Sequence, residues 1–156
     1  MDAEPVSFSI VITTYNRVEL LKRAIATALS QTVPCQVIVV DNASTDGTQA
    51  YVESLGDRVL YHRNSTNANH SGAVNAGVER ATGTWIKLVD DDDYLAPTCI
   101  ETMIGAIQQR PEAVICSCQA AQVDSAGQEL SRTPITGPGQ MFYIPQVDNH
   151  NGMFLE

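Results

Sequence analysis

The segment FSIVITTYNRVELLKRAIATALSQTVPCQVIVVD, residues 8–41, contains a strand pattern, a helix pattern and a second strand pattern in succession. Residues 8–14 form an apolar, β-branched run of the kind found in buried parallel strands. Residues 18–31 place apolar side chains at helical spacing, and residues 33–41 form another β-branched run. This order predicts a β-α-β unit with a right-handed crossover.

The alternation continues through most of the chain. Further strand patterns lie at residues 58–63, 84–89, 113–123 and 128–131, and further helical patterns lie at residues 48–56, at 73–83 and after Pro97. We therefore expect a Rossmann-like α/β/α sandwich with a mostly parallel central sheet. Residues after 131 contain no complete unit. The sheet is thus expected to be truncated at its C-terminal side, with an unpaired edge that favours a homodimer.

The composition describes an acidic globular protein. The chain has 156 residues, enough for one domain, and a net charge of −9 from 9 basic and 18 acidic residues. This acidity argues against a nucleic-acid partner and an anionic membrane surface, because both select basic faces. No apolar stretch approaches the ~18 residues that span a bilayer, and the acidic start MDAEPVSFS lacks a signal-peptide pattern. We therefore expect a cytoplasmic protein without a membrane span.

Four aspartates follow the predicted strand 84–89, in the stretch VDDDDYLAP at residues 89–97. In an extended chain Asp90 and Asp92 project to one side, and Asp91 and Asp93 project to the other. Two carboxylates spaced in this way can bind one hard divalent cation, so we expect Mg²⁺ or Mn²⁺ at Asp90 and Asp92. For Asp91 and Asp93 the alternative is an acidic first turn that favours the dipole of the next helix.

Polar side chains also follow the first two predicted strands, as TTYN at residues 13–16 and DNASTDG at residues 41–47. Ligands of open α/β sheets bind at the carboxyl ends of the strands, so these clusters and the aspartates predict one shared site. Tyr15 either stacks on a nucleobase or covers the adjoining helix. Asp41 either accepts hydrogen bonds from a base or ribose, or holds its own turn.

Other interpretations fit parts of the sequence. Counted from Asn42, the loop has the residue spacing of an EF-hand, but a β-branched strand rather than a helix precedes it. Cys116 and Cys118 offer half of a metal site, although reduced, packed cysteines are the simpler interpretation. A receiver-like phosphoacceptor site needs a lysine after a late strand, and the only lysines are Lys22 and Lys87. Glycine-rich dinucleotide and P-loop fingerprints are absent.

Four blocks in order resemble family 2 glycosyltransferases of the GT-A fold. They are SIVITTYNR (9–17), VIVVDNASTDGT (37–48), the stretch 67–89 and DDDDYLAP (90–97). The resemblance covers nearly all of residues 7–122 and implies metal-dependent, inverting transfer of a sugar from a nucleotide-diphosphate sugar. A UDP-sugar is the expected donor, and a saccharide or lipid is the expected acceptor. The acidic run is similar to the family's D-x-D element, which implies that Asp92 and Asp90 are the metal ligands, with Asp92 preferred as the direct one.

The resemblance also implies a set of nucleotide-binding residues. They are Thr13, Tyr15, Asn16, Asp41, Gly72, Asn75 and Asp91. Thr13 and Tyr15 would line the base pocket, Asp41 would bond the base, and Asp91 would lie near the ribose or the phosphates. Gly72 and Asn75, together with Gly77, match a block that closes over the nucleotide. Val74 stands where the family often has arginine, and Asn42 stands where a second aspartate is frequent.

The resemblance implies one glycosyltransferase-like domain over residues 1–156. Residues 7–122 would be the donor core, and residues 123–156 would begin an incomplete acceptor half. The family's catalytic base is an acidic residue of the acceptor half, so we expect it beyond Glu156. The tail DNHNGMF resembles the strand that begins that half, where His150 or Asn151 would face the site. Without a base, the alternative function is a nucleotide-sugar binding module that has no transferase activity.

Overall fold

The structure is a computed structural model that describes residues 5–124 and 127–133. The chain divides into two compact units, residues 1–102 and 103–156. The elements of the first unit are β1 (Phe8–Thr14), α1 (Val18–Leu29), β2 (Gln36–Asp41), α2 (Thr48–Glu53), a 3₁₀ turn (Gly56–Arg58), β3 (Leu60–Arg63), α3 (Asn69–Val78) and β4 (Trp85–Asp90). Helix α4 (Cys99–Gln109) follows Pro97, as the sequence predicts.

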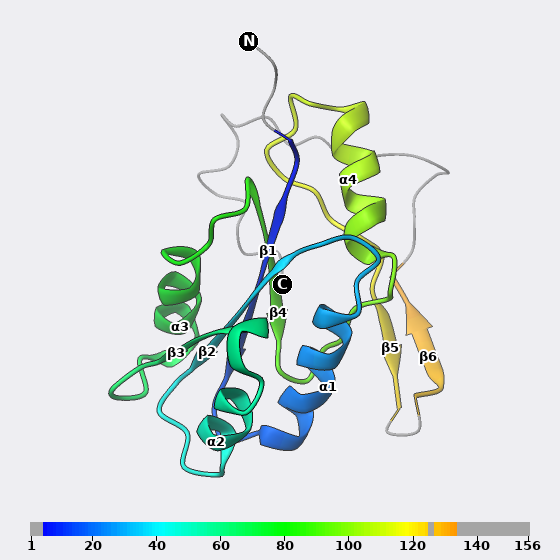
Figure 1. The fold of residues 1–156 in the computed structure, drawn as a ribbon. Coiled ribbons are helices and arrows are strands. Elements are labelled where there is room, and N and C mark those ends of the chain that lie inside the picture. Colours follow the sequence, from blue (N-terminus) through cyan, green and yellow to red (C-terminus); the bar gives the residue numbers. More distant parts are fainter. Residues whose placement is uncertain (1–4, 125–126, 134–156) are drawn as a thin grey trace. The chain divides into compact units, whose positions relative to one another are not determined.

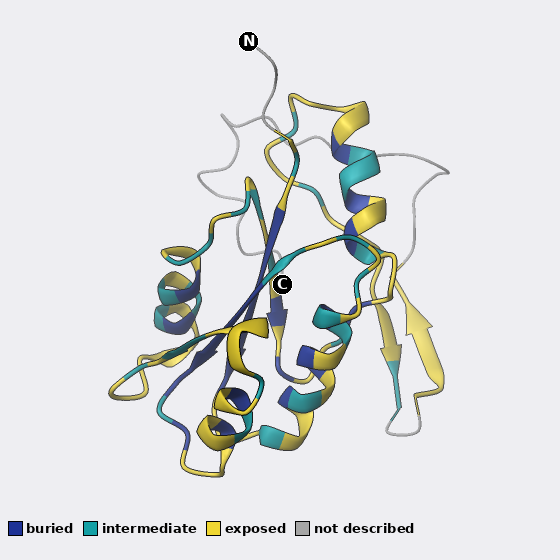
Figure 2. Ribbon diagram, in the orientation of Figure 1, coloured by how far each residue is buried: buried dark blue, intermediate teal, exposed yellow. Residues whose placement is uncertain are grey.

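The four strands form one parallel sheet in the order β3-β2-β1-β4. This confirms the predicted α/β fold with a parallel central sheet. Strand β1 lies between β2 and β4, and all of its residues are buried, as the dark blue of the strand shows in Figure 2. Continuous burial is what a parallel strand covered on both faces requires, and it explains the apolar run of residues 8–14.

Helices cover both faces of this sheet. Right-handed crossovers from β1 to β2 and from β2 to β3 place α1 and α2 on one face, and the return toward β4 places α3 on the other. Figure 1 shows α3 apart from α1 and α2. Val11, Ile38 and Val40 form a buried cluster with Ala73 of α3. Ile12 is fully buried as well, and by strand alternation its side chain lies on the same face as that of Ile10, opposite Val11.

The strand order reverses between β1 and β4. Chain segments from β1 to β3 proceed in one direction across the sheet, and β4 then returns to the other side of β1. In open α/β sheets such a reversal marks the crevice where ligands bind, outside the carboxyl ends of the strands. The register pairs Thr13 with Asp90, which brings the first aspartate of the acidic run next to the end of β1.

Two predicted elements differ from the structure. The helix predicted at residues 73–83 instead begins at Asn69, whose φ is 60°, and ends at Val78. The strand predicted at residues 113–123 is wrong over residues 113–120, which form no strand and are largely exposed. Strand β5 is only Ala121–Val123, and it pairs antiparallel with β6 (Glu129–Arg132) in a separate two-stranded sheet. An apolar run does not by itself supply the neighbouring strand that a sheet needs.

Some predictions concern residues that the structure does not describe. His150, Asn151 and Glu156 lie outside the described residues, and so does the predicted first strand of an acceptor half. The boundary of the donor core at residue 122 stays a prediction. None of the helices in the described parts of the chain combines the length and the apolar character needed to cross a bilayer.

Candidate functional site

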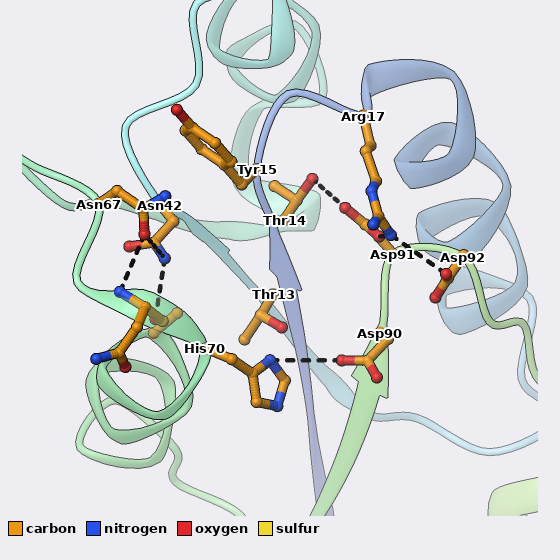
Figure 3. Close-up of a pocket in the computed structure, with 12 residues that line it drawn as sticks. Thr13, Thr14, Tyr15, Arg17, Asn42, Asn67, His70, Asp90, Asp91 and Asp92 are labelled. Carbon is orange, nitrogen blue, oxygen red and sulfur yellow. Dashed lines mark hydrogen bonds and ion pairs between the residues drawn. The ribbon is translucent and has the colours of Figure 1, made fainter.

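A cavity of about 580 Å³ opens at the carboxyl ends of β1, β2 and β4 (Figure 3). Its wall also includes the loop that leads into α3. The lining residues are Thr13, Thr14, Tyr15, Arg17, Asn42, Asn67, Asn69, His70, Ala73, Asp90, Asp91 and Asp92. The structure therefore brings the TTYN cluster and the acidic run, which are more than 70 residues apart in sequence, to one cavity. The location agrees with the topological switch point of the sheet.

The acidic run turns as soon as β4 ends. The backbone N–H of Asp93 donates to the carbonyl of Asp90 at 3.1 Å. Within this turn Asp91 is buried, and it accepts hydrogen bonds from Thr14 Oγ1 at 2.7 Å and Arg17 Nη1 at 3.1 Å. The same Nη1 lies 3.2 Å from Asp92 Oδ2. The predicted alternation is thus wrong here, because Asp91 and Asp92 share one guanidinium.

Arg17 offsets much of the repulsion between these neighbouring carboxylates. The negative charge of Asp91, its hydrogen bond and then the charge of Asp92 raise the pKa of Arg17. Burial, followed by the negative charges of Asp92 and Asp90, raises the pKa of Asp93, and the positive charge of Lys87 offsets only part of this effect. In this run Asp91 is therefore the best compensated carboxylate, Asp92 shares its guanidinium, and Asp90 and Asp93 have no contact with Arg17.

Asp90 and His70 face each other across the cavity. Nδ1 of His70 lies 3.8 Å from Oδ1 of Asp90, and both side chains are more than half exposed. The two residues also border an adjoining cavity of about 120 Å³, which Val74 lines as well. Val74 stands where the family resemblance leads one to expect an arginine, so this side of the site is apolar at that position. The polar group on the same side is the imidazole of His70.

Asn42 fixes the loop that forms the opposite wall. Its Nδ2 donates to Asn67 Oδ1 and to the carbonyl of Asn69, both at 2.9 Å. Its Oδ1 accepts from Asn64 Nδ2 at 3.0 Å and from the backbone N–H of Ala68 at 2.8 Å. A primary amide has two donors and two acceptor lone pairs, so the buried Asn42 side chain is fully satisfied. Asn42 therefore acts on the cavity through the segment 64–69.

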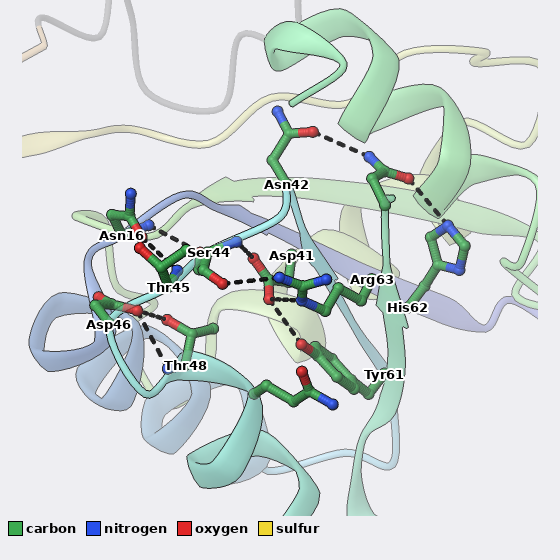
Figure 4. A network of polar contacts seen from close by, with 12 residues as sticks. Asn16, Asp41, Asn42, Ser44, Thr45, Asp46, Thr48, Tyr61, His62 and Arg63 are labelled. Carbon is green, nitrogen blue, oxygen red and sulfur yellow. Dashed lines mark hydrogen bonds and ion pairs between the residues drawn. The ribbon is translucent and has the colours of Figure 1, made fainter. Parts of the chain in front are cut away.

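Asp41 lies beneath this wall in a separate network (Figure 4). It is fully buried, and its carboxylate accepts hydrogen bonds from the backbone N–H of Ser44 at 2.8 Å and from the hydroxyl of Tyr61 at 2.7 Å. Nε of Arg63 lies 3.4 Å from Asp41 Oδ2. Asp41 does not line the 580 Å³ cavity, and its contact with a base stays a prediction.

The other predicted nucleotide-binding residues fall into two groups. Tyr15 lines the cavity with 46% of its surface exposed, so its ring is accessible to a ligand. Asn16 does not line the cavity. It has φ 53° and joins two loops, since its N–H donates to Ser44 Oγ at 2.8 Å and its Oδ1 accepts from the N–H of Thr45 at 2.7 Å. Gly72 and Asn75, on α3, also lie off the lining, and their roles stay predictions.

Sequence reasoning assigned no role to several residues of the cavity wall. They are Thr14, Arg17, Asn67, Asn69 and His70. Arg17 ends the block SIVITTYNR and follows a predicted strand end, which is a usable signal for Arg17 and for Thr14. Asn67, Asn69 and His70 carry no such signal, because the segment reads only as a polar loop.

The donor set favours a hard cation held together with a ligand. Asp90 and Asp92 line the same cavity, with side chains 55% and 54% exposed, and present carboxylate oxygens. Across the described residues there is no group of three or more His, Cys, Asp or Glu that could hold a metal ion. One or two carboxylates completed by phosphate oxygens is the usual arrangement for Mg²⁺, and these residues fit it.

Comparison with known proteins finds a match to the family model described as glycosyl transferase family 2, over residues 9–155. The succinoglycan biosynthesis protein ExoO of Rhizobium meliloti is 40% identical over 96 residues, which is 60% of this chain and 28% of that protein. S. aureus TarS 1-349 in complex with UDP-GlcNAc is similar with a TM-score of 0.64 and 25% identity, over 68% of this chain and 32% of that one. The mannosyltransferase PcManGT of Pyrobaculum calidifontis, in complex with GDP-Man and Mn²⁺, has a TM-score of 0.55 and 26% identity, over 69% and 34%. The chain thus spans about a third of the length of these proteins.

Proposed function

This chain belongs to glycosyl transferase family 2, and we propose that it binds the donor of a glycosyl transfer, a UDP-sugar, in the 580 Å³ cavity. The observation that carries the proposal is the convergence of Tyr15 and the Asp90–Asp92 run at the switch point of a parallel sheet. One end of that cavity offers an aromatic face and the other offers carboxylates. A nucleoside diphosphate needs both features, a surface for the base and a cation site for the phosphates.

The nucleotide part of the donor is proposed to lie along the ends of β1 and β4. Tyr15 stacks on the base, and Thr13 borders the base and the ribose from the end of β1. Asp91 is held in place by Thr14 and Arg17, so it positions the acidic segment and lies nearest the ribose. The UDP-GlcNAc complex of TarS supports UDP as the nucleotide.

Asp92 and Asp90 are proposed to hold a divalent cation together with the diphosphate. A cation there supplies positive charge to the departing diphosphate. The exposure of both carboxylates and the Mn²⁺ in the PcManGT complex support this assignment. His70 borders Asp90 and is available as a hydrogen-bond donor to a phosphate or sugar oxygen on the same side.

Transfer itself is proposed to proceed with inversion. The acceptor hydroxyl loses its proton to a carboxylate base as its oxygen bonds the anomeric carbon, and the bond from that carbon to the diphosphate breaks. In this proposal all carboxylates of the cavity wall bind the cation or the nucleotide, so the base is expected outside the described residues. Relatives named as glucosyltransferases favour transfer over a binding module without activity, and the acceptor, a saccharide or lipid, stays a prediction.

Calorimetric titration tests the donor site. We expect UDP to bind in the presence of Mn²⁺ more tightly than GDP or dTDP, and to bind weakly in EDTA. The variant Asp92→Asn keeps the shape of the side chain and removes its charge, so it should weaken Mn²⁺-dependent binding by about tenfold or more, or 1.4 kcal/mol. Asp57→Asn is the matched control, because Asp57 lies in the 3₁₀ turn and not on the cavity. Equal binding by wild type and Asp92→Asn would refute the metal assignment.

A further inference from the structure

Arg17 holds the acidic segment through a single nitrogen atom. Nη1 contacts Asp91 Oδ1 at 3.1 Å and Asp92 Oδ2 at 3.2 Å. Asp91 is buried, and its second oxygen is already bonded to Thr14 Oγ1, so the guanidinium is fixed on this side. The side chain of Asp92 is 54% exposed and is the weaker partner, because water can replace Arg17 there.

The same contact places a permanent positive charge at the proposed cation site. A guanidinium within hydrogen-bond distance of Asp92 neutralises that carboxylate and repels a divalent cation that would share it. Arg17 cannot withdraw easily, since leaving would strip the buried Asp91 of its charged partner. The free protein is therefore poorly prepared to bind a metal ion alone.

An anionic diphosphate would reverse this balance. The side chain of Arg17 is 52% exposed and lines the cavity, and Nε and Nη2 make no hydrogen bond with the part of the chain that the structure describes. These free donors suit phosphate oxygens, which guanidinium groups bind in a planar, forked geometry. A bound diphosphate would thus satisfy Arg17 and screen its charge from the cation.

We propose that Arg17 couples the two ligands of the site, disfavouring a divalent cation on Asp92 until a nucleoside diphosphate is bound. This inference rests on the proposed function, and it assigns to Arg17 a contact with Asp92 in the free protein and a contact with the diphosphate in the complex. Because coupling between two binding sites is reciprocal, the cation raises the affinity for the diphosphate by the same factor.

The test is a binding cycle on the full 156-residue chain. Free Mn²⁺ is measured by electron paramagnetic resonance with and without saturating UDP, for wild type, Arg17→Met and Arg17→Lys. In Arg17→Met, Mn²⁺ alone should bind roughly tenfold more tightly than in wild type, and the enhancement by UDP should fall by roughly tenfold or more. Arg17→Lys keeps a charge beside Asp91 and should retain weak binding of Mn²⁺ alone.

Arg58→Met is the matched control, because it removes the same charge from the exposed 3₁₀ turn, outside the cavity. It should leave both affinities unchanged, and circular dichroism reports whether each variant is folded. An unchanged enhancement by UDP in Arg17→Met would overturn the inference and leave donor binding intact. UDP binding that Mn²⁺ does not affect in wild type would overturn it too, whereas no UDP binding at all would overturn the proposed function as well.

Discussion

Asp41 shows how one buried charge organises the residues around it. The carboxylate has no exposure to solvent, and its partners come from its own loop and from the neighbouring strand β3. The parallel register sets Asp41 opposite Arg63, and Tyr61 lies two residues earlier on the same strand. Removing one partner of a buried charge leaves the charge undercompensated, so this network should be sensitive to small changes.

Tyr61→Phe removes a single oxygen from that network. Burial, the hydrogen bond to Asp41 and then the charge of Asp41 raise the pKa of Tyr61 above its ordinary value of about 10. The folded state therefore favours the protonated phenol. Its stabilisation is fully present below about pH 10 and is lost as the pH rises further. At pH 8 we expect the variant to be less stable by about 1.5–3 kcal/mol in urea unfolding, the usual contribution of a hydrogen bond to a charged group.

The stability difference between wild type and Tyr61→Phe should narrow above pH 10, because the unfolded wild-type chain then loses its phenol proton while the folded state still holds it. Tyr51→Phe is the control, since Tyr51 contributes its ring face to Lys22 and its hydroxyl makes no hydrogen bond within the described residues. A difference that stays constant or widens up to pH 11.5 would contradict the assignment of the hydrogen bond to the protonated phenol.

Pairs of polar residues that are far apart in sequence and in contact in the fold were not predictable from the sequence alone. Asp41 and the aspartate run were recognisable because each follows a strand pattern. The partner of Asp91 is Arg17, 74 residues away, and that pairing depends on the strand order and the register. The sequence showed Asn42 as a departure from the family pattern and as the start of an EF-hand-like spacing, and its four hydrogen bonds became evident only from the position of residues 64–69.

At the scale of elements, α3 shows how closely a helix can approach the sheet. A Cβ built on Gly77 would collide with Val11 Cγ1 and lie 3.1 Å from Val40 Cγ2. Both valines are fully buried strand residues that have no room to move. The glycine therefore permits the close packing of α3 on β1 and β2. This packing accounts for Gly77 whatever its part in nucleotide binding.

Gly77→Ala should destabilise the fold by about 1–3 kcal/mol, as overpacking of a core usually does. Helix propensity alone predicts the opposite sign, a gain of up to about 1 kcal/mol. Gly105 of α4 provides the matched control, because a Cβ there has no neighbouring atom within 4 Å, and Gly105→Ala should be stabilising. Urea midpoints at constant m-value measure both effects. A midpoint that rises in both variants would show that α3 does not pack as described.

Helices and strands were predictable where a segment with a periodic pattern also had a neighbouring element to pack against, and less so elsewhere. The four parallel strands and the helices between them followed from alternating patterns. The start of α3 did not, because Asn69 adopts a positive φ and its carbonyl is held by Asn42, which are features of tertiary structure. Residues 113–120 have the composition of a strand, but strand formation depends on a neighbouring strand that composition does not reveal.

At the scale of the whole molecule, the proposed site for an anionic donor lies in an acidic protein. The net charge is −9, and the described cavity wall carries three aspartates against one arginine. One bound divalent cation would leave the chain strongly negative. The position of the site follows from sheet topology, which the sequence predicts well, whereas its electrostatic balance depends on the contacts of Arg17.

This charge should slow the approach of the donor. Long-range repulsion acts over the Debye length, which falls from about 30 Å at 0.01 M salt to about 10 Å at 0.1 M. We therefore expect the association rate constant of UDP, measured by stopped flow at saturating Mn²⁺, to rise several-fold over that range of NaCl. Most steered complexes of opposite charge show the reverse trend.

Uridine serves as the uncharged control, and its association rate should not depend on salt because it carries no phosphate. A UDP rate that falls as salt is added would contradict the expectation. Such a fall would mean that the field at the cavity mouth, set by Arg17, His70 and the bound cation, outweighs the net charge. The sign of the salt dependence therefore distinguishes two cases. An association rate that rises with salt indicates that the net charge of the protein governs UDP association, and one that falls indicates that the few charges at the cavity mouth govern it.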